Sequence, residues 1–171
     1  LAVYQDSKSK VTATQPFNSS NKFSQAYIEG MKKTFYKGAP ERLVTKAKKY
    51  LDKSGKVVEL NREVLDKKID ELANRAMRVL AFGYSEKKLV EDKINDDIVI
   101  IGLVGIRDDV RPEAKQAIEE VQGAGIQVVM ITGDSLTTAL AIAKNIGLID
   151  EDSEGIEGKK LAKYSDSEMV N

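Results

Sequence analysis

Residues 102–147 read GLVGIRDDVRPEAKQAIEEVQGAGIQVVMITGDSLTTALAIAKNIG. This stretch predicts a helix that opens at Pro112, a strand over Ile126–Ile131 and a second helix over Leu136–Asn145. Apolar residues of the first helix share one face, and glycines follow both helices, where they commonly end a helix. One such αβα unit is typical of a doubly wound parallel sheet, but a single strand is only a part of a sheet.

Polar residues follow the predicted strand, namely Thr132, Gly133 and Asp134. In open α/β sheets ligands bind at the carboxyl ends of strands, and the free amides of a helix N-terminus favour a phosphate. The same three residues also suit a plain turn in which Asp134 or Ser135 caps the next helix. The three residues alone leave both interpretations open.

The first two thirds of the chain follow a different pattern, in which strands and helices do not alternate regularly. The predicted elements are an antiparallel meander over residues 11–36, helices over 40–51 and 61–77, and buried strands over 78–84 and 98–106. This order indicates an α+β domain, with an antiparallel sheet and flanking helices.

Composition limits the chemistry. The 171 residues include no cysteine and no histidine, so catalysis would rest on Asp, Glu, Lys, Arg, Ser, Thr or Tyr. Lys plus Arg and Asp plus Glu are equal at 27 each, which gives no global charge to attract nucleic acid. No apolar run approaches the roughly 18 residues that cross a bilayer, and the N-terminus LAVYQDSKSK lacks a signal-peptide pattern. Because the sequence begins with a strand-like run at Leu1–Tyr4 and without an initiator methionine, we interpret it as a fragment of a longer protein.

Four motifs occur in a fixed order and carry a family resemblance. They are FNSSNK at residues 17–22, KGAPE at 37–41, AMRVLA at 76–81 and the stretch 102–147 quoted above. They resemble the F-S-x-x-R-K, K-G-A-P-E and L-R-V-L-A motifs of P-type cation-transporting ATPases, and the D-P-x-R hinge that precedes A-G-I and M-I-T-G-D. The likeness extends from Leu1 to about Leu148.

The resemblance implies an organisation in two parts. Residues 1–106 would form the nucleotide-binding domain, residues 107–111 a hinge, and residues 112–171 an incomplete phosphorylation domain with a polar tail. The second part would be an incomplete haloacid-dehalogenase-like α/β segment.

The resemblance assigns nucleotide binding to Phe17, Lys22, Lys37, Gly38 and Arg78. An aromatic ring can stack on adenine, cations can meet the charge of a triphosphate, and a glycine lets the backbone approach a ligand closely. Each residue also has an ordinary interpretation, because a phenylalanine is often a core residue and a lysine is usually solvated surface.

In the second part, the resemblance implies that Thr132 binds phosphoryl oxygens, beside Gly133, and that Asp134 holds ATP near the metal. Asp108 and Arg111 would belong to the hinge, although they could also form a surface ion pair of little weight. No residue of this chain is assigned as a metal ligand.

The sequence departs from the family pattern at three positions. Asn21 stands where an arginine is usual and Ser19 where a basic residue is often found, so we expect weak nucleotide binding. Asp109 replaces the usual hinge proline, which predicts a looser linker. The acidic residue that relatives place before the phenylalanine is not evident. PFNS and DxVRPE favour calcium-transporting pumps of the plasma-membrane type.

The intact protein would use ATP and Mg²⁺ to phosphorylate an aspartate and couple that step to cation transport. Its partners would be the transmembrane, actuator and remaining phosphorylation domains, with the cation bound elsewhere, no nucleic acid, and this portion on the cytoplasmic side of an integral membrane protein. No D-K-T-G-T motif is present, so the fragment alone is expected not to turn over ATP.

Two other functions remain open. A non-catalytic nucleotide-sensing module could keep the ATP site without the nucleophile. A haloacid-dehalogenase-like phosphatase would need a D-x-D motif on an earlier strand, and the sequence has none in that place.

Overall fold

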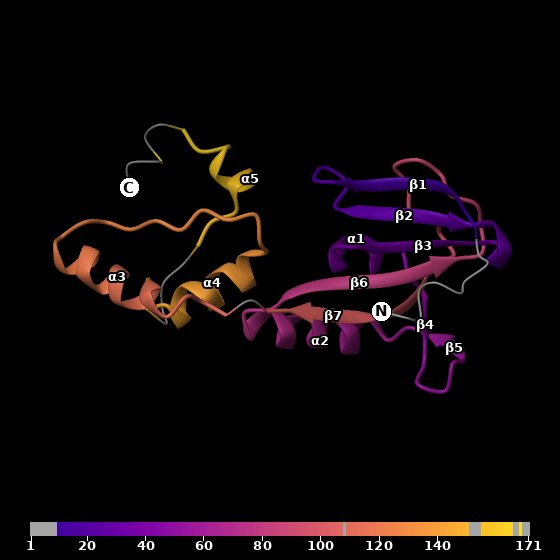
Figure 1. The fold of residues 1–171 in the computed structure, drawn as a ribbon, viewed down its shortest axis with the longest axis horizontal. Coiled ribbons are helices and arrows are strands. Elements are labelled where there is room, and N and C mark those ends of the chain that lie inside the picture. The colour runs from indigo at the N-terminus through magenta and orange to yellow at the C-terminus, as the bar shows by residue number, and fades with distance from the viewer. Residues whose placement is uncertain (1–9, 108, 151–154, 166–167, 169–171) are drawn as a thin grey trace. The chain divides into compact units, whose positions relative to one another are not determined.

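The structure is a computed structural model that describes residues 10–107, 109–150, 155–165 and 168 (Figure 1). Contacts divide the described residues into two compact units. The first takes its residues from Leu1–Ile69 and Val79–Ile106, and the second from Asp70–Arg78 and Arg107–Asn171.

A seven-stranded sheet is the frame of the first unit. The strands are β1 (Val11–Asn18), β2 (Phe23–Ile28), β3 (Lys33–Gly38), β4 (Lys49–Leu51), β5 (Val57–Glu59), β6 (Arg78–Ser85) and β7 (Val99–Ile106), in the order β1-β2-β3-β6-β7-β4-β5. The antiparallel pairings of β1 with β2 and of β2 with β3 confirm the predicted meander. β3 also pairs antiparallel with β6, and β4 pairs parallel with β7, so the sheet is mixed. The predicted α+β class is confirmed, but the prediction of an antiparallel sheet is wrong for β4 and β7, whose pairing is parallel.

Two helices contribute to the core of this unit, α1 (Pro40–Leu43) and α2 (Arg62–Asn74), and a 3-10 turn, η2 (Glu29–Met31), joins β2 to β3. The predicted helix over 61–77 is confirmed within its ends. The core consists of buried residues from α1 and the segment after it, from β2, β3, β6 and β7, and from the residue before β7: Phe23, Tyr36, Leu43, Val44, Ala81, Ile98 and Ile100.

The predicted helix over 40–51 is wrong beyond its first turn, because α1 ends at Leu43 and Lys49–Leu51 forms β4. The hydroxyl of Thr45 donates to the carbonyl of Glu41 at 2.6 Å, a bond that competes with regular helical continuation. Pairing of β4 with both β5 and β7 then supplies the backbone partners that a helix would have supplied. Tertiary pairing thus outweighs the helical spacing of the apolar residues.

Strand β7 is only partly buried, against the prediction for residues 98–106. Val99 and Ile100 are buried, whereas Ile101, Val104 and Ile106 are between 41% and 48% exposed. Leu65 and Ile69 of α2 pack on the same core as α1. Burial of β7 is therefore lost toward its C-terminal end, since Val104 and Ile106 are exposed although they alternate in step with the buried Ile100.

The second unit contains α3 (Glu113–Gly123), α4 (Leu136–Asn145) and α5 (Gly158–Leu161). The two predicted helices are confirmed, but the predicted strand over 126–131 is wrong, since these residues form neither strand nor helix. Ile131 is 93% exposed and Val129 70% exposed. A strand needs partners for its amides and carbonyls, and no strand in the described residues pairs with this segment. Across the described ranges, no helix is both long and apolar enough to cross a membrane.

Candidate functional site

The strand register around Phe17 places this residue in a bulge of β1. Gln15 pairs with Gln25 and Asn18 pairs with Phe23, so two residues of β1, Phe17 and the proline before it, stand opposite one residue of β2. Proline is tolerated at a bulge and at an edge strand because it cannot donate to the ladder. Phe17 is 62% exposed, so the core interpretation of this phenylalanine is wrong.

A row of four side chains crosses the sheet at this level. Ser24 is the residue of β2 opposite the bulge, Ser24 pairs with Lys37, and Lys37 pairs with Phe82. Residues directly opposite each other share a face of the sheet. We call Phe17, Ser24, Lys37 and Phe82 the transverse row.

Three members of the transverse row, Ser24, Lys37 and Phe82, line a hollow of about 270 Å³. Phe35, two residues before Lys37 and on the same face, also lines it. The surface of the hollow is mainly apolar and includes Phe35 and Phe82, and Lys37 is the one charged residue among those that line it, a chemistry that suits a planar ring carrying a nearby negative charge. Sequence reasoning missed Ser24 and Phe82, because only the strand register reveals that they neighbour Lys37.

Gly38 has a structural role that differs from the predicted one. A Cβ at this position would lie 2.6 Å from the carbonyl oxygen of Lys22, 2.6 Å from Cβ of Phe23 and 2.8 Å from Cα of Phe23. Gly38 pairs with Phe23 and is buried. The protein's own packing therefore requires this glycine, and a close approach of a ligand is not needed to explain it.

Lys22 ends the turn that joins β1 to β2. Its backbone has φ of 58°, its amide donates to the carbonyl of Asn18 at 2.6 Å, and its carbonyl accepts from Ala39 at 2.9 Å. The ammonium lies 3.0 Å from a carboxylate oxygen of Glu41, and both side chains are about half exposed. An exposed pair of this kind contributes little stability, so the ammonium is easily released for another anion.

Asn21, which replaces the usual arginine, is bound within the protein. Its amide nitrogen donates to Oδ1 of Asp92, which lies in the connection between β6 and β7. The same carboxylate oxygen accepts from the side chain of Gln15 at 2.8 Å. Asn21 thus anchors the turn, and no signal in the sequence points to its partner 71 residues away.

In the second unit the structure brings together three residues that the sequence singled out. The guanidinium of Arg78 lies 2.5 Å from Oδ1 of Asp134, whose side chain is only 13% exposed. The hydroxyl of Thr132 lies 3.3 Å from Oδ2 of Asp134 and accepts from its amide at 3.1 Å. Ser135, and not Asp134, caps α4, since its side chain accepts from the amide of Thr138. The turn interpretation is therefore correct for Ser135, and a ligand role for the other residues stays a prediction.

Of the two predicted hinge residues, Asp108 lies outside the described residues and Arg111 is exposed. The guanidinium of Arg107 lies 3.3 Å from Oδ1 of Asp109, an exposed pair two residues apart. The hinge role stays a prediction. Within the described ranges, no group of three or more acidic side chains could hold a metal ion.

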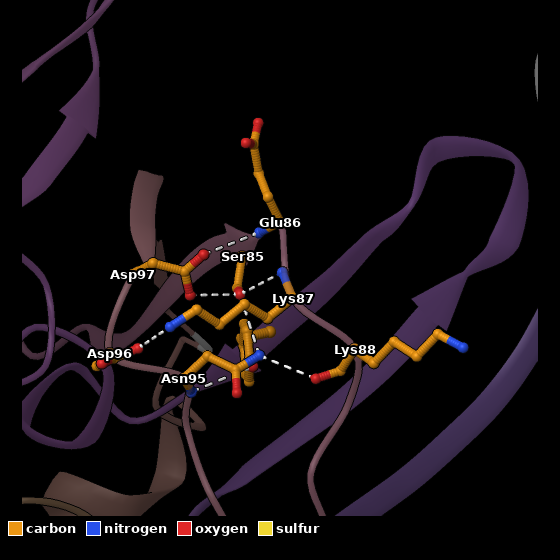
Figure 2. Close-up of polar contacts among 8 residues, drawn as sticks. Ser85, Glu86, Lys87, Lys88, Asn95, Asp96 and Asp97 are labelled. Atoms are coloured by element: carbon orange, nitrogen blue, oxygen red, sulfur yellow. Dashed lines mark hydrogen bonds and ion pairs between the residues drawn. The ribbon is translucent and has the colours of Figure 1, made fainter.

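A buried polar cluster fixes the two ends of the connection between β6 and β7 (Figure 2). The hydroxyl of Ser85 donates to Asp97 at 2.6 Å and accepts from the side-chain amide of Asn95 at 3.0 Å. The backbone amide of Asn95 donates to the hydroxyl of Tyr36 at 3.3 Å. Burial raises the pKa of Tyr36, and this tyrosine also belongs to the core.

Comparison with known proteins identifies the family. The family model described as "P-type ATPase, cytoplasmic domain N" matches residues 2–113. The chain therefore belongs to the P-type ATPase family, and residues 2–113 correspond to its cytoplasmic domain N.

Individual relatives resemble almost the whole chain. "Calcium-transporting ATPase 10, plasma membrane-type" of Oryza sativa subsp. japonica is 35% identical over 95% of this chain and 17% of its own length. "Calcium-transporting ATPase" of Bacillus subtilis (strain 168) is 34% identical over 96% of this chain and 19% of its own length. "Cation-transporting ATPase pma1" of Synechocystis sp. is 35% identical over 91% of this chain and 18% of its own length. The chain thus spans less than a fifth of these relatives.

Proposed function

We propose that this chain is the ATP-binding portion of a cation pump, and that the transverse row is where the nucleotide binds. The observation that carries the proposal is the exposed ring of Phe17, which lies in the same row across the sheet as Lys37. A ligand that covered this exposed ring would gain the free energy of removing apolar surface from water. Adenine, with a flat apolar face, is suited to such a ring.

The neighbouring cations would meet the phosphates. Lys37 lines the hollow, and the ammonium of Lys22 is held only by an exposed pair with Glu41. Arg78, the first residue of β6, pairs with Asp134 within the second unit, and a nucleotide-binding role for this arginine is part of the proposal. Since the described residues offer no cluster of carboxylates, Mg²⁺ would be held mainly by ATP and by residues outside them.

The second unit would be the beginning of a phosphorylation domain. We propose residues 1–106 as the nucleotide domain, 107–111 as a hinge containing Asp108 and Arg111, and 112–171 as an incomplete haloacid-dehalogenase-like segment. The exposed apolar segment 126–131 supports this proposal, because it would form a strand of a sheet that other parts of the protein complete. Thr132, Gly133 and Asp134 would then lie at the edge where such sheets bind ligands.

The whole protein would transfer the γ-phosphoryl group of ATP to an aspartate and couple this step to calcium transport. Support comes from relatives named as calcium-transporting ATPases in a plant and in a bacterium. Its other parts would include transmembrane and actuator domains, with this portion on the cytoplasmic side. Transfer of the phosphoryl group depends on positioning and on charge compensation, which is what the proposed lysines supply.

Replacing Phe17 tests the proposal. We expect Phe17→Ala to weaken ATP binding by about 2 kcal/mol, as loss of a base-stacking aromatic does elsewhere, with an unchanged unfolding midpoint because the ring is exposed. Phe17→Tyr should retain most of the affinity. An NMR titration with ATP, with and without Mg²⁺, measures both affinity and position, the expected shifts being at Phe17 and Lys37.

The matched control is Tyr50→Ala, which removes an aromatic that is 37% exposed on β4, a strand outside the transverse row. Its ATP affinity should equal that of the unchanged chain. Equal affinities for Phe17→Ala and Tyr50→Ala would contradict the proposed site, and shifts confined to residues outside the transverse row would place the nucleotide elsewhere.

A further inference from the structure

The connection between β6 and β7 reaches across the sheet to the turn that carries the nucleotide motif. Its tip is a tight turn at Val90–Lys93, where the amide of Lys93 donates to the carbonyl of Val90 at 3.2 Å. Asp92 in this tip has φ of 57°, a left-handed conformation that aspartate tolerates better than most residues. The tip therefore presents the side chain and the amide of Asp92 in a fixed direction.

Three hydrogen bonds join Asp92 to the segment around Phe17. The amide of Asp92 donates to Oε1 of Gln15 at 2.9 Å, and its Oδ1 accepts from Nε2 of Gln15 at 2.8 Å and from Nδ2 of Asn21. Gln15 precedes the bulge and Asn21 follows it. One carboxylate oxygen thus holds the chain on both sides of Phe17.

Buried groups fix the tip itself, so the anchor is not a loose surface contact. Gln25, which is 3% exposed, donates from its side chain to the carbonyl of Val90 at 2.8 Å and to Oε1 of Gln15 at 2.7 Å. At the base of the connection, Ser85 and Asn95 hold the two ends together (Figure 2). A connection tied at its base and at its tip can transmit a fixed position to the turn.

We propose that Asp92 is a positioning residue for nucleotide binding, which holds the bulge and the turn at residues 19–22 so that Phe17 and Lys22 face the ligand. This inference rests on the proposed function above. This role explains Asn21, because its side-chain amide donates to the carboxylate of Asp92 and thereby stabilises the turn. The amide of Lys22, bonded to the carbonyl of Asn18, is the reporter of turn order.

The test uses Asp92→Gly, because glycine keeps the left-handed backbone and removes the carboxylate. We expect the amide of Lys22 to exchange with solvent about tenfold faster without nucleotide, and the dissociation constant for ATP to rise about three- to tenfold. The unfolding midpoint of the first unit should change little, since Asp92 is exposed. Asp92→Asn retains an acceptor oxygen, so its Lys22 exchange rate and its dissociation constant for ATP should be close to those of the unchanged chain.

Glu91→Gln is the matched control, because it removes one negative charge from the neighbouring exposed residue and should change neither value. A double-mutant cycle with Asn21→Ala adds a specific readout. The two changes should be non-additive in the exchange rate of Lys22, because they remove the same bond.

The outcomes separate this inference from the proposed function. Unchanged exchange at Lys22 in Asp92→Gly would overturn the anchor, and faster exchange with an unchanged ATP affinity would overturn its positioning role. Absence of ATP binding by the unchanged chain would instead refute the proposed function, and with it the positioning role, while the exchange rate would still decide whether Asp92 anchors the turn.

Discussion

Gly38→Ala is expected to lower the free energy of unfolding of the first unit by about 3 kcal/mol, at the upper end of the cost of overpacking. The added methyl group would lie 2.6 Å from the carbonyl oxygen of Lys22 and 2.8 Å from Cα of Phe23. Both are backbone atoms of neighbouring strands or turns, so no side-chain rotation can relieve the contact. Urea unfolding followed by the amide NMR signals of β2 and β3 measures the change.

Gly102→Ala in β7 is the matched control. Nothing lies within 4 Å of the Cβ that it would add, so its stability should match or slightly exceed that of the unchanged chain. Comparing the two variants distinguishes a glycine required by the protein's own packing from one required for the approach of a ligand. If Gly38→Ala kept full stability and lost only ATP affinity, the ligand-approach role would be right and the packing role wrong.

The sequence predicted those elements whose own residues decide their conformation. The meander over 11–36 and the helix Leu136–Asn145 follow from short-range patterns and from a capping serine, and the structure confirms them. The strand at Lys49–Leu51 could not be predicted, because its only advantage is pairing with β5 and β7. The predicted strand over 126–131 shows the converse, an apolar run without a pairing partner in the described residues.

The candidate site also contains some residues that sequence motifs indicate and others that only the strand register reveals. Motif order pointed to Phe17 and Lys37, but their placement in one row depends on a bulge and on strand register. Ser24 and Phe82 carry no motif of their own and become visible only through the same register. Asp92 lies 71 residues from the side chain that it holds in the turn, and nothing near it in the sequence indicates this partner.

Ser85→Ala should be nearly as damaging as Gly38→Ala, with a loss of about 3 kcal/mol, because buried polar groups that lose their partner are costly. Ser85 has no exposed surface. Its hydroxyl donates to Asp97 at 2.6 Å and accepts from the amide of Lys87 and the side chain of Asn95, each at 3.0 Å. Removing one oxygen therefore leaves two donors and one carboxylate oxygen without this partner, in a place that water reaches poorly.

An exposed pair of the same chemistry supplies the control. The hydroxyl of Ser54 donates to Asp52 at 2.7 Å in the turn between β4 and β5, where water can replace the bond, so Ser54→Ala should cost at most about 0.5 kcal/mol. Urea unfolding of both variants compares a buried with an exposed Ser–Asp bond. Equal costs would show that the connection between β6 and β7 does not depend on its buried cluster. A large cost for Ser85→Ala alone, with faster amide exchange at Asp92, would show that order at the base of the connection reaches its tip.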